Sequence, residues 1–445
     1  MNRFLPTAPL DGAQPDSPSP RGGPTDPSHD AKLRRGILET RSSRGVTVGI
    51  TVCFLALIYA VPLGQAWLER TRGEDSPMLD LARHAPTSER LRHFEDDVEQ
   101  ASYAKDFVQP HLQALLTRFG RVGNKRAVVG LGGWLYYAPG VAHLGGPGFL
   151  GEDAIRARER AALDRGEPAI HADPRPAIVD FRAALSKRGI RLILFPVPDK
   201  AMLQPLELHG RPSSGPPGLP VPRNPDWARF VSEMREAGVF VFDPAPPVLR
   251  PGEGPHFLVQ DTHWTPEWME DVAGQLATFV RVVAALSPPE APAPFSAIDA
   301  TAEALGDVAA MLKLPDNQTI FAPQRVTIHE VHDKTGAPWK ADESGEVLLL
   351  GDSFTNVFSM EPMGWGTSAG FGAQLARALG LGVDVIAQND SGAFATREAL
   401  ARALEAGEDR LAGKKAVIWE FASRELSVGD WKPVDWNVSA VREAP

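Results

Sequence analysis

Short apolar strands alternate with amphipathic helices between residues 180 and 421, and this alternation restricts the possible fold more than any other feature of the sequence. The expected helices cover residues 180–189, 227–238, 265–286, 371–380 and 396–411. The expected strands cover residues 190–198, 239–244, 346–354, 383–388 and 414–421. Continuous apolar strands separated by helices indicate a mostly parallel sheet that is covered on both faces. We therefore expect an α/β fold with a mostly parallel sheet flanked by helices.

This body is expected to span residues 120–428. Near its start, residues 124–140 (NKRAVVGLGGWLYYAPG) predict a strand, a glycine turn and a second strand. Residues 287–345 begin with a stretch rich in Pro and Ala and depart from the strand–helix rhythm, which predicts an insertion. Residues 429–445 are expected to form a C-terminal tail.

An uncharged, apolar run at residues 45–68 is long enough to cross a bilayer as a helix. The basic residues just before it are Lys32, Arg34, Arg35, Arg41 and Arg44. Positive charge before a span keeps the N-terminus in the cytoplasm and sends the remainder outside. We expect a single-pass anchor in the inner membrane with the body in the periplasm. A cleaved signal peptide and a buried core helix are the alternatives.

The segments on either side of this run differ in composition. Residues 1–44 are rich in Pro, Ser, Gly and Asp, which predicts a disordered tail. Residues 69–119 are charged and favour helices, so we expect a stalk or leading helices there.

The charge and cysteine content exclude some classes of protein. A formal net charge of −10 argues against a general nucleic-acid-binding protein, because such a protein needs a basic face. The only cysteine, Cys53, lies in the apolar run, so no intramolecular disulfide or cysteine metal cluster can form. His256 has no partner at metal-ligand spacing, and no phosphate-binding Walker loop occurs. We expect no metal and no other cofactor.

The motif LLLGDSF at residues 348–354 predicts an apolar strand that runs into a small-residue turn containing Ser353. In doubly wound folds, sites form at the carboxyl ends of strands. A serine there is exposed, and a neighbouring backbone N–H can stabilise an oxyanion. Gly-Asp-Ser is also ordinary turn chemistry, so the motif alone leaves both interpretations open.

A second motif, QDTHWTPEW at residues 260–268, contains Asp261 and His263 two residues apart. In an extended segment these two side chains point the same way. An imidazole can accept a hydroxyl proton near neutral pH, and a carboxylate can fix its tautomer. The alternative is that Asp261 or Thr262 caps the following helix and His263 packs in the core.

Together the two motifs supply the parts of a catalytic triad: Ser353 as nucleophile, His263 as base and Asp261 as the acid that orients it. The chain order Asp, His, Ser is no obstacle, since triads occur in several orders.

The Gly-Asp-Ser-Phe motif at residues 351–354 resembles the first block of SGNH (GDSL-type) hydrolases. In ordinary members an Asp-x-x-His pair follows the serine, whereas here Asp-Thr-His-Trp precedes it. That arrangement is similar to the SGNH-like domain of the alginate O-acetyltransferase family. The weaker shared motifs are GLGGWL at 130–135, PDK at 198–200, WEF at 419–421 and Arg424. The resemblance covers about residues 120–428 and implies an SGNH-like, flavodoxin-like sheet.

What the resemblance implies is a two-step transfer through an acetyl-serine at Ser353, with His263 moving the proton in both steps. Backbone N–H groups near Ser353 would stabilise the oxyanion, and Asn389 and Gly392 are candidates for the second donor. The acceptor would be a hydroxyl of an extracellular polysaccharide, alginate-like or cellulose-like. The expected partner is a membrane-bound acyltransferase that supplies acetyl groups.

Four further residues are candidates for contacts near the site. Asp352 supports the triad or bonds its own turn. Lys200 meets an acidic sugar or is a solvated surface lysine. Trp264 forms the base of a sugar-binding cleft or packs in the core, and the same two alternatives apply to Trp268 and Trp365. Arg424 binds substrate or forms an i,i+4 pair with Glu420.

Two other functions remain open. The same triad with water as acceptor would make a polysaccharide deacetylase or esterase. A non-catalytic polymer-binding or assembly subunit is the other alternative.

Overall fold

The structure, a computed structural model, describes residues 43–74, 103–210, 219–249, 254–288 and 294–436, together with Thr87, Leu91, Phe94 and Asp97. The chain divides into two compact units, residues 1–106 and 107–445. Most of the expected N-terminal tail lies outside the described residues, and so does the middle of the expected stalk.

In the first unit, α2 (Arg44–Arg72) contains the whole apolar run. The Ser43 side chain caps it by accepting a hydrogen bond from the N–H of Val46, and Gly73 ends it in the left-handed conformation. Within the described part of the chain, α2 is the one helix long and apolar enough to cross a membrane. Its apolar side chains are exposed rather than packed in a core.

The second unit is built around five strands, all of them parallel. In spatial order they are β10 (Val383–Ala387), β9 (Val347–Gly351), β11 (Ala416–Ala422), β3 (Arg191–Val197) and β5 (Phe240–Val241). The predicted parallel sheet is therefore confirmed, with each strand near its expected position.

The strand order explains why the acid and the base precede the serine. If the strands are numbered from β9 onward, with β3 and β5 numbered last, their spatial order is 2-1-3-4-5, which is the flavodoxin-like order. In this chain β3 and β5 come before β9 instead. The loop after β5 therefore lies ahead of the serine turn in sequence, although both belong to the same sheet.

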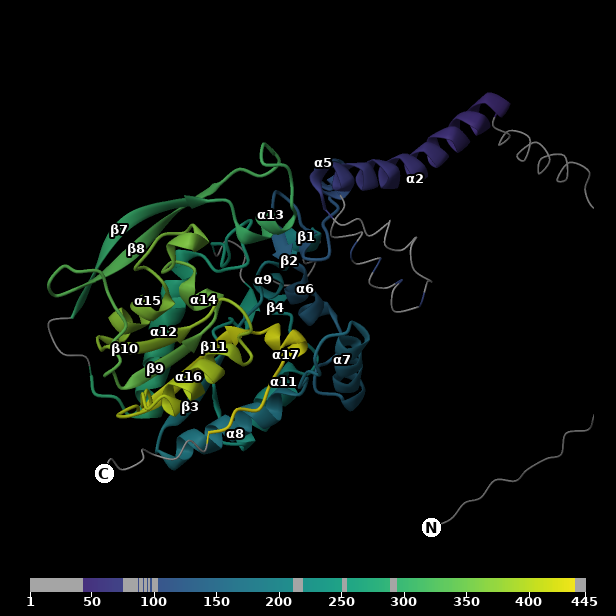
Figure 1. Cartoon of the computed structure of the whole chain (residues 1–445). Coiled ribbons are helices and arrows are strands. Elements are labelled where there is room, and N and C mark those ends of the chain that lie inside the picture. Colours follow the sequence, from purple (N-terminus) through teal and green to yellow (C-terminus); the bar gives the residue numbers. More distant parts are fainter. Residues whose placement is uncertain are drawn as a thin grey trace, which may run out of the picture. The chain divides into compact units, whose positions relative to one another are not determined.

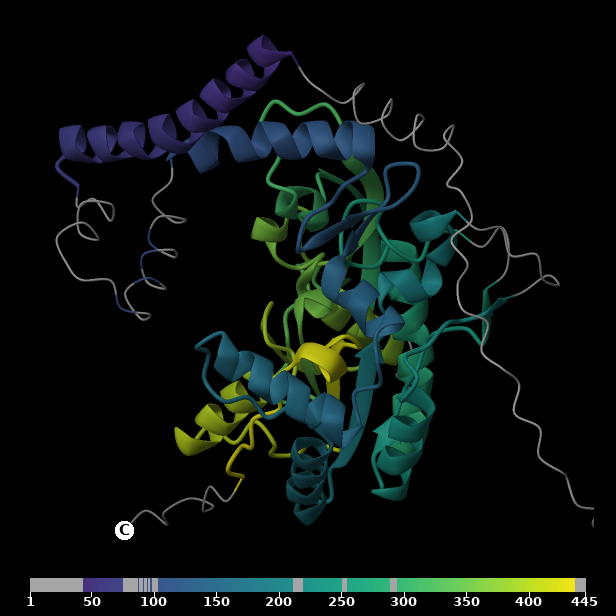
Figure 2. The same ribbon diagram turned by 90° about the vertical axis from the view of Figure 1, so that its right-hand side faces the viewer.

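Each central strand divides its side chains between two cores. In β3, Leu192 and Leu194 join the core that includes α8 (Pro174–Lys187), α11 (Trp227–Glu236) and α16 (Ala395–Glu405). Ile193 and Phe195 join the other core, with α12 (Pro266–Ala284) and α15 (Phe371–Leu379). This period of two is why the strands are apolar throughout, and Figures 1 and 2 show the helices on both sides of the sheet.

The remaining elements surround this framework. They are α5 (Tyr103–Gly120), β1 (Ala127–Val129), β2 (Leu135–Tyr137), α6 (Ala138–Gly145), α7 (Glu152–Asp164), α9 (Lys200–Leu203), α10 (Pro205–His209), β4 (Leu219–Pro220), β6 (Val248–Leu249), β7 (Phe295–Ala304), α13 (Asp307–Met311), β8 (Gln324–Asp333), α14 (Ser353–Asn356), the 3-10 helix η1 (Glu361–Met363) and α17 (Glu425–Val428).

The segment 287–345, whose residues 289–293 lie outside the described part, contains a hairpin and a short helix. β7 and β8 pair antiparallel along their whole length and form a sheet separate from the central one. The hairpin packs against α12 and α15 (Figure 1). α13 follows β7 and reaches the candidate active site.

The body extends beyond residue 428, where the sequence predicted a tail. Trp431 is almost fully buried, and its ring packs against Trp419 and Phe421. Trp436 stacks on Phe181, with 4.4 Å between the ring centroids. Large aromatic surfaces this close to the core hold residues 429–436 in place, a contribution that local sequence composition did not reveal.

Candidate active site

Ser353 lies at the carboxyl end of β9, where the strand turns into α14. Asp352 caps that short helix by accepting a hydrogen bond from the N–H of Phe354. The turn requires glycine at position 351, because a Cβ there would lie 2.2 Å from Oγ1 of Thr355. The tight turn leaves the Ser353 hydroxyl facing the loop that carries the base.

Asp261 and His263 lie in a turn that is closed by a bridge between Phe257 and Trp264. The backbone is bent rather than extended, because Oδ1 of Asp261 accepts the N–H of His263 at 2.9 Å. Thr265 is the N-cap of α12, so the alternative in which Asp261 or Thr262 caps that helix is wrong. Asp261 is therefore available to bond the imidazole.

The structure brings Asp261, His263 and Ser353 into one hydrogen-bonded chain. Nδ1 of His263 donates to Oδ1 of Asp261 at 2.6 Å, since a carboxylate can only accept. Nε2 of His263 then accepts from Oγ of Ser353 at 2.8 Å. All three side chains are buried, and Ser353 keeps 9% of its surface exposed. The distances fit a nucleophile, a base and an orienting acid.

Burial and charge act on this pair in opposite directions. Burial alone would lower the pKa of His263, but the adjacent Asp261 carboxylate outweighs it and the pKa is raised. Burial alone would raise the pKa of Asp261, but the charge of His263 and three hydrogen bonds hold it well below its usual range. Asp261 therefore stays ionised beside the imidazole.

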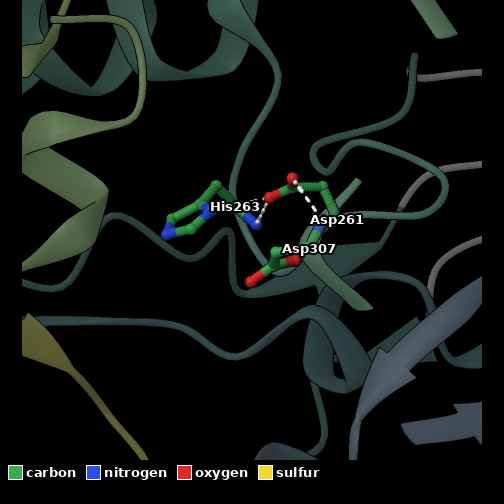
Figure 3. A group of neighbouring side chains, drawn as sticks. All are labelled: Asp261, His263 and Asp307. Atoms are coloured by element: carbon green, nitrogen blue, oxygen red, sulfur yellow. Dashed lines mark hydrogen bonds and ion pairs between the residues drawn. The ribbon is translucent and has the colours of Figure 1, made fainter. Parts of the chain in front are cut away.

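Two residues that the sequence did not link to the triad hold Asp261 in place. Oδ2 of Asp261 accepts the N–H of Asp307 at 3.0 Å and Nε1–H of Trp365 at 2.9 Å. The Asp307 carboxylate in turn accepts the N–H and the hydroxyl of Thr262, at 2.6 and 2.8 Å. Figure 3 shows Asp261, His263 and Asp307 together. Asp307 begins α13 and lies 46 residues after Asp261, so no local spacing could have indicated this contact.

Asp261, His263 and Asp307 also have ligand atoms within 4.8 Å of one another, which is close enough to consider a metal ion. However, both oxygens of Asp261 and both of Asp307 already accept hydrogen bonds from protein groups. A metal would have to displace several of these donors. The donor set fits an ordered acid–base group better than a metal centre.

Glu420 on β11 ties the serine turn to the sheet. Its Oε2 accepts the N–H of Asp352 at 2.9 Å and the hydroxyl of Thr355 at 2.7 Å. Burial, followed by the nearby Asp352 carboxylate, raises the pKa of Glu420 well above its usual range. Oδ2 of Asp352 accepts the N–H of Ala422, so β11 anchors this turn at two points.

Arg424 does not pair with Glu420, which corrects one of the two expectations for it. Its Nη1 lies 3.3 Å from Oδ1 of Asp199, and its guanidinium lies over the ring of Tyr137 at 5.0 Å. Glu420 belongs to β11 and Arg424 to the turn after it, so the i,i+4 geometry of a helix does not apply.

Lys200 is buried, so it is not a solvated surface lysine. Its ammonium is engaged by backbone carbonyls rather than free to meet an acidic sugar. The three N–H groups of its ammonium are shared among the backbone carbonyls of Leu135, Leu258, Val259 and Asp261, which lie 2.6 to 3.0 Å from Nζ. Burial lowers the pKa of Lys200 to about 7. The side chain fixes the loop that carries Asp261 from behind.

Trp264 belongs to the core, and no sugar could lie against its ring. It is fully buried among Phe195, Trp268, Phe354 and Phe371. Phe354 in turn packs edge-on against the His263 ring, with 4.8 Å between the centroids. Trp264 therefore supports the triad through packing.

Ser353 opens onto a pocket of about 350 Å³. Its lining includes Asp352, Asn389, Gly392 and Arg424, all of which the sequence singled out. A Cβ at Gly392 would lie 3.2 Å from both Oδ2 of Asp352 and Cβ of Phe421, so glycine allows this loop to approach the serine turn. Oδ1 of Asn389 accepts from Nδ2 of Asn356 at 2.8 Å.

The sequence matches a known protein family and a known relative. The sequence model of the family described as "SGNH hydrolase-like domain, acetyltransferase AlgX" matches residues 149–423, more than half of the chain. The "Probable alginate O-acetylase AlgJ" of Pseudomonas syringae pv. tomato is 28% identical over 308 residues, which cover 65% of this chain and 73% of that protein.

Two solved structures are also similar. The O-acetyltransferase domain of Pseudomonas putida AlgJ has a TM-score of 0.47 and 23% identity, with 68% of this chain and 93% of that chain covered. Pseudomonas aeruginosa AlgX has a TM-score of 0.45 and 18% identity, with 68% of this chain and 66% of that chain covered.

The family match runs from just before α7 to the end of β11. It therefore takes in both the loop that carries Asp261 and His263 and the turn that carries Ser353. The chain belongs to the AlgX-type acetyltransferase family, whose members share an SGNH hydrolase-like domain.

Proposed function

We propose that this chain is a serine-dependent O-acetyltransferase that moves acetyl groups onto hydroxyls of an extracellular polysaccharide. The observation that carries the proposal is the hydrogen-bonded chain from Asp261 through His263 to Ser353, at 2.6 and 2.8 Å, beside a pocket of about 350 Å³. Membership of an acetyltransferase family supports the same reaction.

In the first step, Oγ of Ser353 attacks the carbonyl carbon of an acetyl donor while Nε2 of His263 accepts the hydroxyl proton. The bond between the acetyl group and the donor's leaving group breaks, and the leaving group takes that proton from His263. The product is an acetyl ester on Ser353. Asp261 stabilises the imidazolium that forms in between.

In the second step, a sugar hydroxyl gives its proton to Nε2 of His263 and its oxygen attacks the acetyl carbonyl. The ester bond to Ser353 breaks, and Oγ recovers the proton from His263. Ser353 is the first residue of α14, so its N–H lacks an acceptor within the helix and can serve an oxyanion. Asn389 and Gly392, which line the same pocket, are our candidates for the second donor.

We also propose that α2 is a transmembrane anchor that holds the body in the periplasm. Its length, apolar composition and exposed side chains support this role. The proposed organisation is a tail at residues 1–44, an anchor at 45–68, a stalk at 69–119 and a catalytic body from residue 120 onward. A membrane-bound acyltransferase is the proposed source of acetyl groups, because such donors are made inside the cell.

The test uses the full-length chain in an uncharged detergent, with an aryl acetate as donor and a panel of oligosaccharides. Mass spectrometry follows acetate on the protein and on the sugars. The proposal predicts acetylated sugar in the wild type and none in Ser353→Ala or His263→Ala. Free acetate with no acetylated sugar would favour the esterase alternative. Polymer acetylation that survives Ser353→Ala in cells would favour the non-catalytic subunit.

A further inference from the structure

The pocket beside Ser353 has an excess of acidic groups. Its charged lining residues are Asp352, Asp390, Glu425, Asp430 and Arg424. Four carboxyl groups therefore face one guanidinium within the described lining of the pocket. This imbalance bears on which sugars can enter.

The one guanidinium is already engaged. Nη1 of Arg424 lies 3.3 Å from Oδ1 of Asp199, and the Arg424 side chain is only 11% exposed. Its guanidinium also lies over the Tyr137 and Phe354 rings, at 5.0 and 5.8 Å. An anionic ligand would have to compete with Asp199 for this charge.

The acidic groups of the pocket differ in whether a nearby cation or protonation offsets their negative charge. Asp430 shares its charge with Lys432, whose Nζ lies 3.6 Å away, and burial raises the pKa of Glu425. Asp352 bonds the backbone N–H groups of Phe354 and Ala422, and it has no cationic partner within ion-pair distance among the described residues. Asp390 is exposed and likewise forms no ion pair within the described part of the chain.

The carboxylates of Asp352 and Asp390 line the same pocket as Ser353, so they affect which sugars can reach the reaction. Asp352 directly precedes Ser353, so a sugar that attacks an acetyl group on Ser353 must come close to it. A second negative charge at such short range is unfavourable because the two charges repel. Neutral sugar hydroxyls, by contrast, can donate hydrogen bonds to the same carboxylates.

We infer that the acceptor is a sugar unit without a carboxylate, a neutral hexose rather than a uronate. The inference rests on the acyl-transfer function proposed above and specifies its substrate class. Alginate, named for a relative of this chain, is a polyuronate, so this chain would use a different class of acceptor.

The experiment compares two acceptors that differ only at C6: β-1,4-linked mannose oligomers and β-1,4-linked mannuronate oligomers of equal length. The full-length chain in uncharged detergent is acetylated with an aryl acetate, and mass spectrometry measures transfer to each sugar. We expect transfer to mannose to exceed transfer to mannuronate by about tenfold or more at low salt. The gap should narrow as ionic strength rises from about 0.05 to about 0.5 M, because salt screens the repulsion.

A matched pair of variants tests the cause. Asp390→Asn removes one exposed charge from the pocket and should raise the mannuronate-to-mannose ratio about fivefold. Glu405→Gln is the control. Phe394, at the start of α16, lines the pocket, whereas Glu405 is the exposed last residue of that helix and does not line the pocket. Removing its charge should therefore leave the ratio unchanged.

Mass spectrometry of the Ser353 peptide separates this inference from the proposed function. If acetyl-Ser353 forms but mannuronate is used as well as mannose, or neither sugar is used, the acceptor inference is overturned and the acyl-enzyme stands. An unchanged ratio in Asp390→Asn would also overturn the inference. If acetyl-Ser353 never forms, the proposed function falls and the inference falls with it.

Discussion

At the scale of single residues, Asp261 is held by four donors from three separate segments. These donors are the N–H and Nδ1–H of His263, the N–H of Asp307 and Nε1–H of Trp365. A carboxylate with this many donors is fixed in position and strongly favours its ionised form. It can therefore hold the His263 tautomer that leaves Nε2 free to accept a proton.

This arrangement predicts that Asp261→Asn abolishes most activity while the protein still folds. The asparagine amide lacks the charge that stabilises the imidazolium, and it can stabilise the wrong tautomer. The rate of acetyl-Ser353 formation should fall by a factor on the order of 10⁴, as in other triads with this change. Stopped-flow measurement with an aryl acetate checks the rate, and circular dichroism checks the fold. A loss of less than tenfold would contradict the role given to Asp261.

The raised pKa of His263 predicts the shape of the pH–rate profile. Only the neutral imidazole can accept the Ser353 proton, so kcat/KM should fall on the acid side at a pH above the ordinary value of about 6.5. Asp307 is one of the carboxylates that raise this pKa, so Asp307→Asn should move the acid limb to lower pH. The profile of both proteins between pH 4 and 9 is the measurement, and an acid limb that does not move would exclude this contribution from Asp307.

The sequence pointed to the three residues of the hydrogen-bonded chain but not to the residues that surround them. Ser353, His263 and Asp261 carry reactive groups in short motifs, so they were visible without a fold. Asp307 and Trp365 act on Asp261 across 46 and 104 residues, and only the tertiary structure brings them together. Lys200 and Trp264 were predicted to be possible substrate contacts because the sequence does not show whether a polar or aromatic side chain is buried by the elements packed around it.

At the scale of elements, the serine turn depends on its link to β11. Glu420 accepts hydrogen bonds from the N–H of Asp352 and the hydroxyl of Thr355, and it is completely buried. The turn and the strand therefore behave as one unit.

This link predicts different effects for two substitutions of Glu420. Alanine leaves two buried donors without an acceptor and should cost about 2–5 kcal/mol of unfolding free energy. Glutamine keeps an acceptor oxygen at this position but has no carboxyl group that can ionise. Because the folded-state pKa of Glu420 is raised, the stabilising contribution of its protonated form is full below the unfolded pKa of about 4.3 and is lost as pH rises through the folded-state pKa.

The wild type should therefore lose more stability between pH 5 and pH 8 than Glu420→Gln does. Urea unfolding at both pH values, followed by tryptophan fluorescence, gives the comparison. Equal losses in the two proteins would show that Glu420 stays ionised in the folded state.

Most elements could be predicted from periodicity, because each apolar strand feeds two cores and each flanking helix has one apolar face. β9, β10, α12 and α15 lie within two residues of their expected ends, apart from the turn that follows β9. The β7–β8 hairpin was missed because β7 is rich in alanine and exposes half of its side chains, so it lacks the continuous apolar run by which the central strands were predicted.

At the scale of the whole molecule, the strand order accounts for the reversed order of the triad. β3 and β5 precede β9, yet all three lie in one parallel sheet. Periodicity predicts such strands but not their order, because the order depends on long-range pairing. The sequence hint was the position of Asp-Thr-His before Gly-Asp-Ser.

The two-unit organisation predicts how the protein fractionates. The full-length chain should be recovered in the membrane fraction, because α2 is long enough to span a bilayer. A chain lacking residues 1–72 should be soluble and should still form acetyl-Ser353, since the sheet and the triad lie wholly in the second unit. Mass spectrometry of the N-terminus distinguishes an anchor from a cleaved signal peptide, and a mature chain that begins near residue 69 would contradict the anchor.

The central claim is that Ser353 carries the acetyl group during transfer, and trapping that intermediate tests it most directly. The full-length chain is mixed with an isotopically labelled aryl acetate, quenched in acid within milliseconds to seconds, and digested for mass spectrometry. The account predicts a label on the Ser353 peptide that forms in the wild type, decays when a sugar acceptor is added and reappears on that sugar. Label that never reaches Ser353, or transfer to sugar that persists in Ser353→Ala, would contradict it.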